Sequence, residues 1–187
     1  MIIKEVKKLR EKVTENWSFI KPPKDTKEFA KELIEAMWSN SGLGISANQL
    51  GYNYRVFAMR GETKKDSIVC FNPEIKDFSP EMNTMEEGCL SLPDVYGIVV
   101  RPAHVAISYQ NEDAKEEGQL ASGMTARIFQ HELDHLDGIL FTDRMGELTR
   151  KLAFEKARKI KKARIDAMIG SPKGTEATTV GDTYLIT

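Results

Sequence analysis

The segment His131-Glu132-Leu133-Asp134-His135 carries two histidines and a glutamate in the pattern H-E-x-x-H. Residues four positions apart lie on one face of an α-helix, so both imidazoles can bind the same metal ion. Glu132 lies one position further round the helix, where it can accept a proton from a metal-bound water without binding the metal. The chain has only three histidines, which makes a chance match rare, and His104 falls in an expected strand. The pattern predicts a hydrolytic metal site.

A catalytic metal of this kind usually has three protein ligands and one open position for water. One protease class supplies a third histidine six residues beyond the second one, but Phe141 occupies that position here. Two candidates remain, Glu155 downstream and Cys89 upstream. Cys89 follows a glycine and two carboxylates in a proline-bounded turn, and two histidines with a thiolate suit a tetrahedral site. Cys70 lies among apolar strand residues and is expected to be a core side chain.

Three short motifs follow one another along the chain: GLGISANQ at 42–49, EGCLS at 87–91 and QHELDH at 130–135. In this order and spacing they resemble the three signature motifs of the peptide deformylase family, and the resemblance extends over about residues 26 to 165. It implies that Cys89, not Glu155, is the third ligand. The first motif departs from the family pattern G-x-G-x-A-A-x-Q at Ser46, whereas Gly44 and Gln49 are retained.

The resemblance implies an activity and a metal. Members of the family remove the formyl group, as formate, from the N-terminal methionine of newly made polypeptides. The metal would be held by Cys89, His131 and His135. Ferrous iron is the implied ion, with Zn²⁺ or Ni²⁺ as alternatives, since the same ligands bind all three. An iron site of this kind would be sensitive to oxygen, because its thiolate ligand can be oxidised.

The resemblance also implies a role for five further residues. Metal-bound hydroxide would attack the formyl carbon while Glu132 acts as general acid/base. The Gln49 side chain and the Leu90 backbone N–H would donate hydrogen bonds to the oxyanion, each at a benefit of about 3–4 kcal/mol to the barrier. Glu87 is similar to a carboxylate that supports the ligands by pairing with an arginine on the next strand, here Arg101.

Four residues are expected to bind substrate. Gly44 resembles a family position at which the missing side chain lets the peptide approach the backbone closely. Met124, Arg127 and Ile128 precede His131 by seven, four and three residues, which places them on or near the metal-facing side of the helix. We expect Met124 and Ile128 to line an apolar pocket for a methionine side chain, and Arg127 to lie at its mouth.

The elements that position these residues indicate an α+β domain. Its strands are expected to be short and mostly antiparallel, packed around a central metal-binding helix, with one helix before them and one after. Apolar spacing and capping residues predict helices over about 26–40, 123–137 and 147–169, the second capped by Ser122 and ended by Gly138. Residues 42–49 read as a loop. Short strands are expected at 54–59, 67–71, 98–100 and 105–109.

Length and composition place these elements in one domain. The 187 residues carry a formal net charge of −1, which implies no overall attraction to nucleic acid or membrane. We expect a catalytic domain at 1–169 and a polar tail at 170–187, whose last four residues leave a further strand open. The start lacks a secretory signal and two cysteines give no case for export, so a cytoplasmic monomer is expected, without membrane association. Its source would be a bacterium, an organelle or a virus infecting bacteria.

The last expected helix is strongly basic. Between 150 and 164 eight residues are basic and only Glu155 is acidic. Such a run usually forms a solvated helix face. It also suits a contact of helix 147–169 with ribosomal RNA, where nascent formylated chains emerge. Two other functions stay open, namely a zinc protease that uses Glu155 and a non-catalytic ribosome-binding module with a structural metal.

Overall fold

The computed structural model describes residues 2–170, so most of the tail expected at 170–187, including its last four residues, lies outside the described part. The helices are α1 (Val6–Leu9), α2 (Thr26–Ser39), α3 (Gly123–Leu136) and α4 (Glu147–Gly170), with short 3-10 turns at Ala47–Leu50, Lys64–Asp66 and Phe141–Asp143. The strands are β1 (Gly44–Ser46), β2 (Val56–Met59), β3 (Ile68–Phe78), β4 (Met82–Cys89), β5 (Leu92–Pro102), β6 (His104–Gln110) and β7 (Glu116–Ser122).

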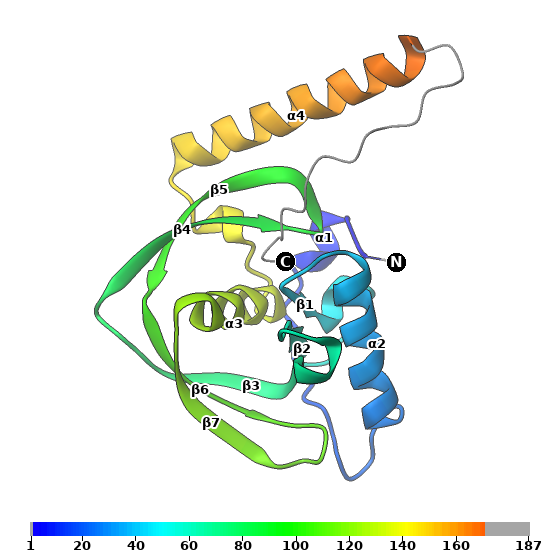
Figure 1. Ribbon diagram of the computed structural model, residues 1–187, viewed down its shortest axis with the longest axis vertical. Helices are drawn as coiled ribbons and strands as arrows, with labels where there is room; N and C mark the ends of the chain where they lie inside the picture. The colour runs from blue at the N-terminus through cyan, green and yellow to red at the C-terminus, as the bar shows by residue number, and fades with distance from the viewer. Residues whose placement is uncertain (1, 171–187) are drawn as a thin grey trace.

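The strands form two antiparallel sheets around helix α3. One has five strands in the order β1-β2-β3-β6-β7, and the other is the hairpin of β4 and β5. Figure 1 shows α3 at the centre, with the five-stranded sheet on one side and the β4–β5 hairpin on the other. The expected α+β class, with its antiparallel strands and central helix, is confirmed.

Alternating side chains in the five-stranded sheet explain why helices cover both of its faces. Val56 and Ala58 of β2 pack in one apolar cluster with Leu33 and other side chains of α2. Phe57, the residue between them, faces the other way and packs edge-on against Phe129 of α3. This is the two-residue period of a strand buried on both faces. Helix α3 is therefore buried on nearly all sides.

The helix ends follow the sequence signals in most respects. The Asp25 side chain accepts a hydrogen bond from the Glu28 backbone N–H, as expected of a cap. Ser122 occupies the cap position of α3 but makes no capping hydrogen bond through its side chain. Gly138 follows α3 with φ at +74°, and a Cβ there would lie 2.5 Å from the Arg10 carbonyl oxygen. Glycine thus ends this helix for both conformational and steric reasons.

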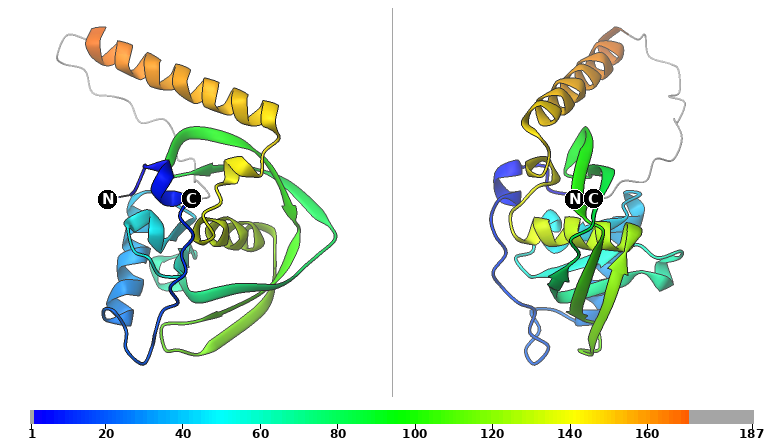
Figure 2. Two further views of the ribbon diagram at one scale, coloured as in Figure 1. Left: turned by 180° about the vertical axis from the view of Figure 1, so that it is seen from behind. Right: turned by 90° about the vertical axis from the view of Figure 1, so that its left-hand side faces the viewer.

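Helix α4 lies against β5, and its C-terminal part extends away from the rest of the chain in Figures 1 and 2. The apolar spacing that predicted this helix does not mark its packed face. Leu148 and Leu152 are 70% and 55% exposed, whereas Ala153 is buried with Phe154 and Ala157 beside it. Ala153, Phe154 and Ala157 therefore form the packed face, and further along the helix Arg164 donates to Asp94 of β5 at 2.8 Å. Within residues 2–170, no helix is long and apolar enough to cross a membrane.

Candidate metal and catalytic site

Two elements bring the three expected ligands together. Cys89 is the last residue of β4, at an irregularity where Gly88 pairs with Tyr96 and Cys89 pairs with Leu92. Such irregularities redirect a side chain, and this one directs the thiol toward α3. His131 and His135 lie one turn apart on α3, with ring centroids 4.9 Å apart. The ligating atoms of the three residues all lie within 4.8 Å of one another.

The donor set fits a tetrahedral ion. Cys89 Sγ lies 3.3 Å from His135 Nε2, and ligands at about 2.0–2.3 Å from a tetrahedral metal stand about 3.5 Å apart. His131 Nε2 is buried and has no hydrogen-bond partner among the described residues, as expected of a nitrogen that faces a metal. Glu155 on α4 does not belong to this group of described residues.

Phe141 contributes to this site by packing. It stands where one protease class has its third histidine, and its ring stacks on His131 at 5.9 Å between centroids. Phe141 therefore covers one face of the His131 imidazole. Because it cannot bind a metal, the third ligand must come from another element, here the hairpin.

Glu132 lies beside the ligands in a dry environment. It is fully buried, and neither carboxylate oxygen has a hydrogen-bond partner among the residues that the structure describes. Burial, together with the negative charge of Glu87, raises the pKa of Glu132 well above its ordinary value, against the smaller opposing effects of the nearby Ser46 hydroxyl and of Arg101. An unpaired buried carboxylate is costly to a fold, and perturbed groups of this kind are typical of catalytic sites.

Gly44 of β1 makes room for that carboxylate. A Cβ on Gly44 would lie 2.5 Å from Glu132 Oε1 and 2.9 Å from its Cδ. No side chain fits at this position without moving Glu132. The family resemblance implies that glycine at position 44 lets the peptide approach closely. The structure adds a second reason, since a side chain here would collide with Glu132.

Replacing Gly44 with alanine is expected to lower kcat/KM for the expected hydrolysis by about 100-fold, because displacement of a catalytic group by about 1 Å costs this much. Metal content should stay normal, since no ligand is touched. Gly118→Ala is the matched control, because its Cβ would meet only the Ile107 carbonyl oxygen at 3.4 Å. Equal activities of the two variants would contradict the steric role of Gly44.

Gln49 is held with its amide nitrogen toward Cys89. Its Oε1 accepts hydrogen bonds from the Ser46 backbone N–H at 2.9 Å and from the Ser46 hydroxyl at 3.0 Å. Its Nε2 donates to Ser91 Oγ at 3.0 Å and lies 3.6 Å from Cys89 Sγ. The Ser46 backbone N–H can only donate, so it fixes which end of the amide faces the metal ligands. The serine hydroxyl adds a contact that alanine lacks.

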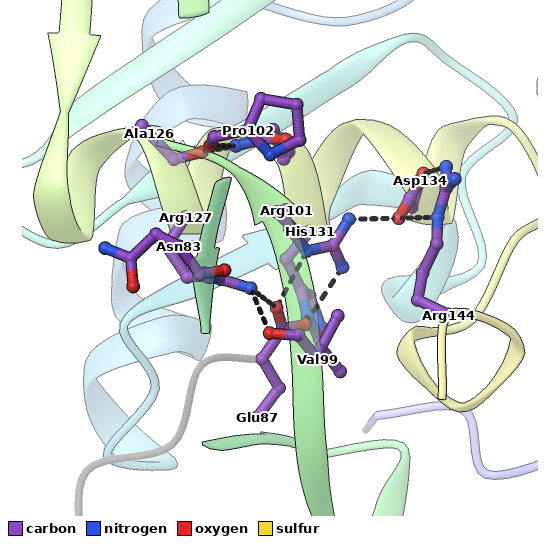
Figure 3. Close-up of polar contacts among 11 residues, drawn as sticks. Asn83, Glu87, Val99, Arg101, Pro102, Ala126, Arg127, His131, Asp134 and Arg144 are labelled. Carbon is purple, nitrogen blue, oxygen red and sulfur yellow. Dashed lines mark hydrogen bonds and ion pairs between the residues drawn. The ribbon is translucent and has the colours of Figure 1, made fainter. Parts of the chain in front are cut away.

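Glu87 joins the hairpin to α3 through a set of buried ion pairs, drawn in Figure 3. Arg101 donates to both of its oxygens, at 2.7 and 2.9 Å, and His131 Nδ1 lies 2.8 Å from Oε2. Burial alone would raise the pKa of Glu87, but the bonds from Arg101 and His131 lower it. Glu87 is therefore ionised, and its bond with the Nδ1 hydrogen of His131 leaves Nε2 free for the metal.

Asp134 and Arg144 were missed from the sequence. Asp134 accepts a hydrogen bond from Arg101 at 2.6 Å, and Arg144 donates to it at 2.6 and 3.1 Å. Figure 3 shows Arg101 between Glu87 and Asp134, with Arg144 on the far side. Asp134 stands between the two histidines in the motif, and that position was the only signal available.

Burial also sets the charge of the metal-free ligands. It raises the pKa of the Cys89 thiol to about 12, with the negative charge of Glu132 adding to the effect. Burial holds the pKa of His135 well below its ordinary value, and the positive charge of Arg101 adds to the effect. At neutral pH the thiol is protonated and His135 is neutral, so a metal must displace the thiol proton as it binds.

A cavity of about 540 Å³ opens beside the ligands. Cys89 and Leu90 lie on its wall next to the metal site, and Pro93 and Tyr96 of the hairpin continue it. Its size is within the range of small-molecule and peptide sites.

The three expected substrate-binding residues of α3 differ in burial and in their contacts. Ile128 is buried in the core cluster with Phe129, and Met124 is 46% exposed near the start of the helix. Arg127 does not lie at a pocket mouth, and this part of the prediction was wrong. Its side chain is buried and bonds to Glu87. Helix phase gave its direction correctly, but the carboxylate partner lies on another element.

The fold and the site together define an α+β protein with a candidate metal site of the hydrolase type, to which a helix contributes two histidines and a glutamate and a hairpin contributes a cysteine. Comparison with known families places it further. The family model for polypeptide deformylase matches residues 2–151, so the chain belongs to that family.

Two curated relatives and one solved structure illustrate the match. The peptide deformylase of Picosynechococcus sp. is 40% identical over 124 residues, which cover 65% of this chain and 66% of that protein. The peptide deformylase of Agrobacterium fabrum is 39% identical over 140 residues, covering 73% and 82%. A crystal structure of the Synechococcus elongatus peptide deformylase in complex with actinonin superposes with a TM-score of 0.76 at 31% identity, covering 84% and 85%. The chain is thus an enzyme of the peptide deformylase family.

Proposed function

We propose that this protein removes the formyl group from the N-terminal methionine of newly made polypeptides and releases formate. Family membership supports the reaction, and one observation in the site supports it most strongly. A thiolate and two imidazoles converge within 4.8 Å beside a buried carboxylate that has no partner of its own among the described residues. A structural metal site would fill its fourth position and would need no such carboxylate.

Cys89, His131 and His135 would hold one divalent ion, for which we propose Fe²⁺, with Zn²⁺ or Ni²⁺ as alternatives. When bound, the ion would supply Lewis-acid chemistry, lowering the pKa of a water and polarising the formyl carbonyl. The bond from His131 Nδ1 to Glu87 would keep that imidazole in the tautomer that binds metal.

The remaining catalytic roles fall to three residues. Glu132 would take the proton of the attacking water and return it to the leaving amine, a step worth about 10²–10⁴-fold. The Gln49 amide and the Leu90 N–H would donate to the oxyanion. The Ser46 and Ser91 contacts of Gln49 support its role, because they orient this amide before substrate arrives.

Substrate recognition is proposed to involve residues next to the three metal ligands. The methionine side chain would pack against Ile128 and Met124, and the peptide backbone would run along Gly44. The cavity beside Leu90 and Tyr96 would take the residues that follow methionine.

The test is an anaerobic assay of the purified protein on formyl-Met-Ala-Ser, with metal analysis on the same sample. We expect formate release, no cleavage of acetyl-Met-Ala-Ser, and inhibition by actinonin, the compound bound in the S. elongatus relative. An inactive protein that contains stoichiometric metal would contradict the enzymatic role and favour a non-catalytic module. The protease alternative with Glu155 is not favoured, because Glu155 lies outside the group of described side chains that can hold a metal.

We further propose that α4 contacts ribosomal RNA. Seven of its eight basic side chains between 150 and 164 are exposed, while Ala153 and Phe154 pack against the hairpin. Reversing the charge of three exposed lysines, Lys159→Glu, Lys161→Glu and Lys162→Glu together, is expected to abolish cosedimentation with ribosomes at low salt. For every lysine that pairs with a phosphate in the wild type, the substitution should reduce the slope of log affinity against log salt by about 0.7–0.9.

The control for this experiment is a second triple reversal, at the exposed lysines Lys31, Lys64 and Lys65 near α2. It changes the net charge equally but leaves α4 intact. An equal decrease of ribosome binding in both variants would indicate a general charge effect and would contradict a specific contact through α4.

A further inference from the structure

The Glu87 carboxylate has one more partner than the family resemblance implies. Arg127 Nη1 donates to Glu87 Oε1 at 2.8 Å, in addition to the two bonds from Arg101 and the one from His131. A carboxylate has about four lone-pair sites, so these four contacts saturate it. All four side chains are buried. Arg127 is among the largest fully buried side chains of the described protein.

The charges show why one arginine is insufficient here. Arg101 is shared between two carboxylates, since its Nη1 also donates to Asp134 at 2.6 Å. Two buried negative charges would therefore face a single buried positive charge. Arg127 balances them, and the ion pair of Arg144 with Asp134 lies closer to solvent, the Arg144 side chain being 45% exposed. Removing one partner from such a buried set leaves an uncompensated charge, which costs far more than a surface ion pair.

Arg127 also connects the two elements that carry the metal ligands. It lies on α3 one turn before His131, and both side chains bond to Glu87 of β4. Its remaining hydrogen bonds go to backbone carbonyls of the hairpin, Asn83 in β4 at 2.8 Å and Val99 in β5 at 3.1 Å. Figure 3 shows this side chain extending from α3 to the hairpin strands.

We propose that Arg127 is a positioning residue for the metal site, which holds the hairpin that carries Cys89 against the helix that carries both histidines. By this contact it sets the separation of the thiolate from the imidazoles and fixes Glu87 in the orientation that directs His131. Its hydrogen bonds go to Glu87 and to two hairpin carbonyls, and none goes to a proposed metal ligand. The role rests on the metal site of the proposed function and adds to it a residue that acts only through Glu87 and the hairpin backbone.

The experiment compares Arg127→Met and Arg127→Lys with the wild-type protein. Affinity for Zn²⁺ is measured by competition with a chromophoric chelator, and the absorption spectrum of the Co²⁺ form reports thiolate and imidazole ligation. Arg127→Met is expected to weaken Zn²⁺ binding by about 10–100-fold, the usual effect of removing a partner of a metal ligand. Its Co²⁺ spectrum should shift. Arg127→Lys should recover part of the affinity, because it restores the charge but not the planar set of donors.

Arg55→Met is the matched control. Arg55 is also a largely buried arginine bonded to the helix region, donating to Asp137 and to the Val13 carbonyl at 3.0 Å each. Its removal should lower stability in urea unfolding while Zn²⁺ affinity and the Co²⁺ spectrum remain those of the wild type.

The possible results distinguish the positioning role from the proposed function itself. An Arg127→Met protein that is less stable but has wild-type Zn²⁺ affinity and Co²⁺ spectrum would overturn the positioning role. If Arg127→Met does not fold, the same comparison is made with Arg127→Lys, for which unchanged affinity and spectrum would again overturn it. A wild-type protein that binds no metal would instead overturn the proposed function, on which this role depends.

Discussion

Replacing Cys89 with alanine is expected to weaken metal binding by more than about 100-fold and to abolish deformylation with it. Changes to groups that only support metal ligands cost about 10–100-fold in affinity, so removing a ligand must cost more. The remaining imidazoles of His131 and His135 lie on one helix and cannot close a tetrahedral site without a third ligand. Metal content after dialysis, chelator competition and formate release on the same sample measure the effect.

Cys70→Ala is the control for this experiment. Cys70 is as buried as Cys89, and burial raises the pKa of its thiol well above the ordinary value, but it packs in the core with Phe57 and Phe129. Its removal should lower the free energy of unfolding and leave metal content and activity unchanged. A Cys89→Ala protein with stoichiometric metal and wild-type hydrolysis would contradict Cys89 as ligand and would restore Glu155 as a candidate.

The sequence predicted those helices and strands in which apolar side chains recur at the spacing of a helix or a strand. Helix α2 has both a cap at Asp25 and apolar side chains at helical spacing, and it was found nearly to the residue. The strands β1, β4 and β7 were missed. Strand β7 (EEGQLAS) lies at the sheet edge with mostly exposed side chains, and β1 is a three-residue strand in a glycine-rich segment. Such strands form because partners pair with them, which local sequence does not record.

The residues of the candidate site also differ in how far local sequence predicted them. His131, Glu132 and His135 follow from spacing on one helix, whereas Cys89 and the Glu87–Arg101 pair depended on the family resemblance. Arg127 shows the limit most clearly. Its phase on the helix was correct, but a buried charged side chain is defined by its partner, and that partner lies 40 positions earlier in the chain.

Replacing Glu132 with glutamine is expected to lower kcat on a formyl-methionyl peptide by about 10²–10⁴-fold, the usual contribution of a general acid/base. Glutamine keeps the size of the side chain but cannot take a proton. Because the proposed function gives Glu132 no role as a ligand, metal content should be retained. Disappearance of the metal together with activity would contradict a purely acid/base role.

The same substitution should stabilise the metal-free protein. The Glu132 carboxylate is buried without a partner in the described structure, and burying an ionised carboxylate costs far more than burying the neutral amide of glutamine. Burial raises its pKa in the folded state well above the ordinary value of 4.5. Above pH 4.5 the folded state therefore binds more protons at this group than the unfolded state does, and its contribution to stability falls as pH rises toward the folded-state pKa. Glutamine removes this dependence, so the gain of Glu132→Gln over wild type in urea unfolding should grow as the pH rises above 4.5. A gain that is constant across this range would show that burial does not raise the pKa of Glu132. Its ability to act as a base would then need another explanation.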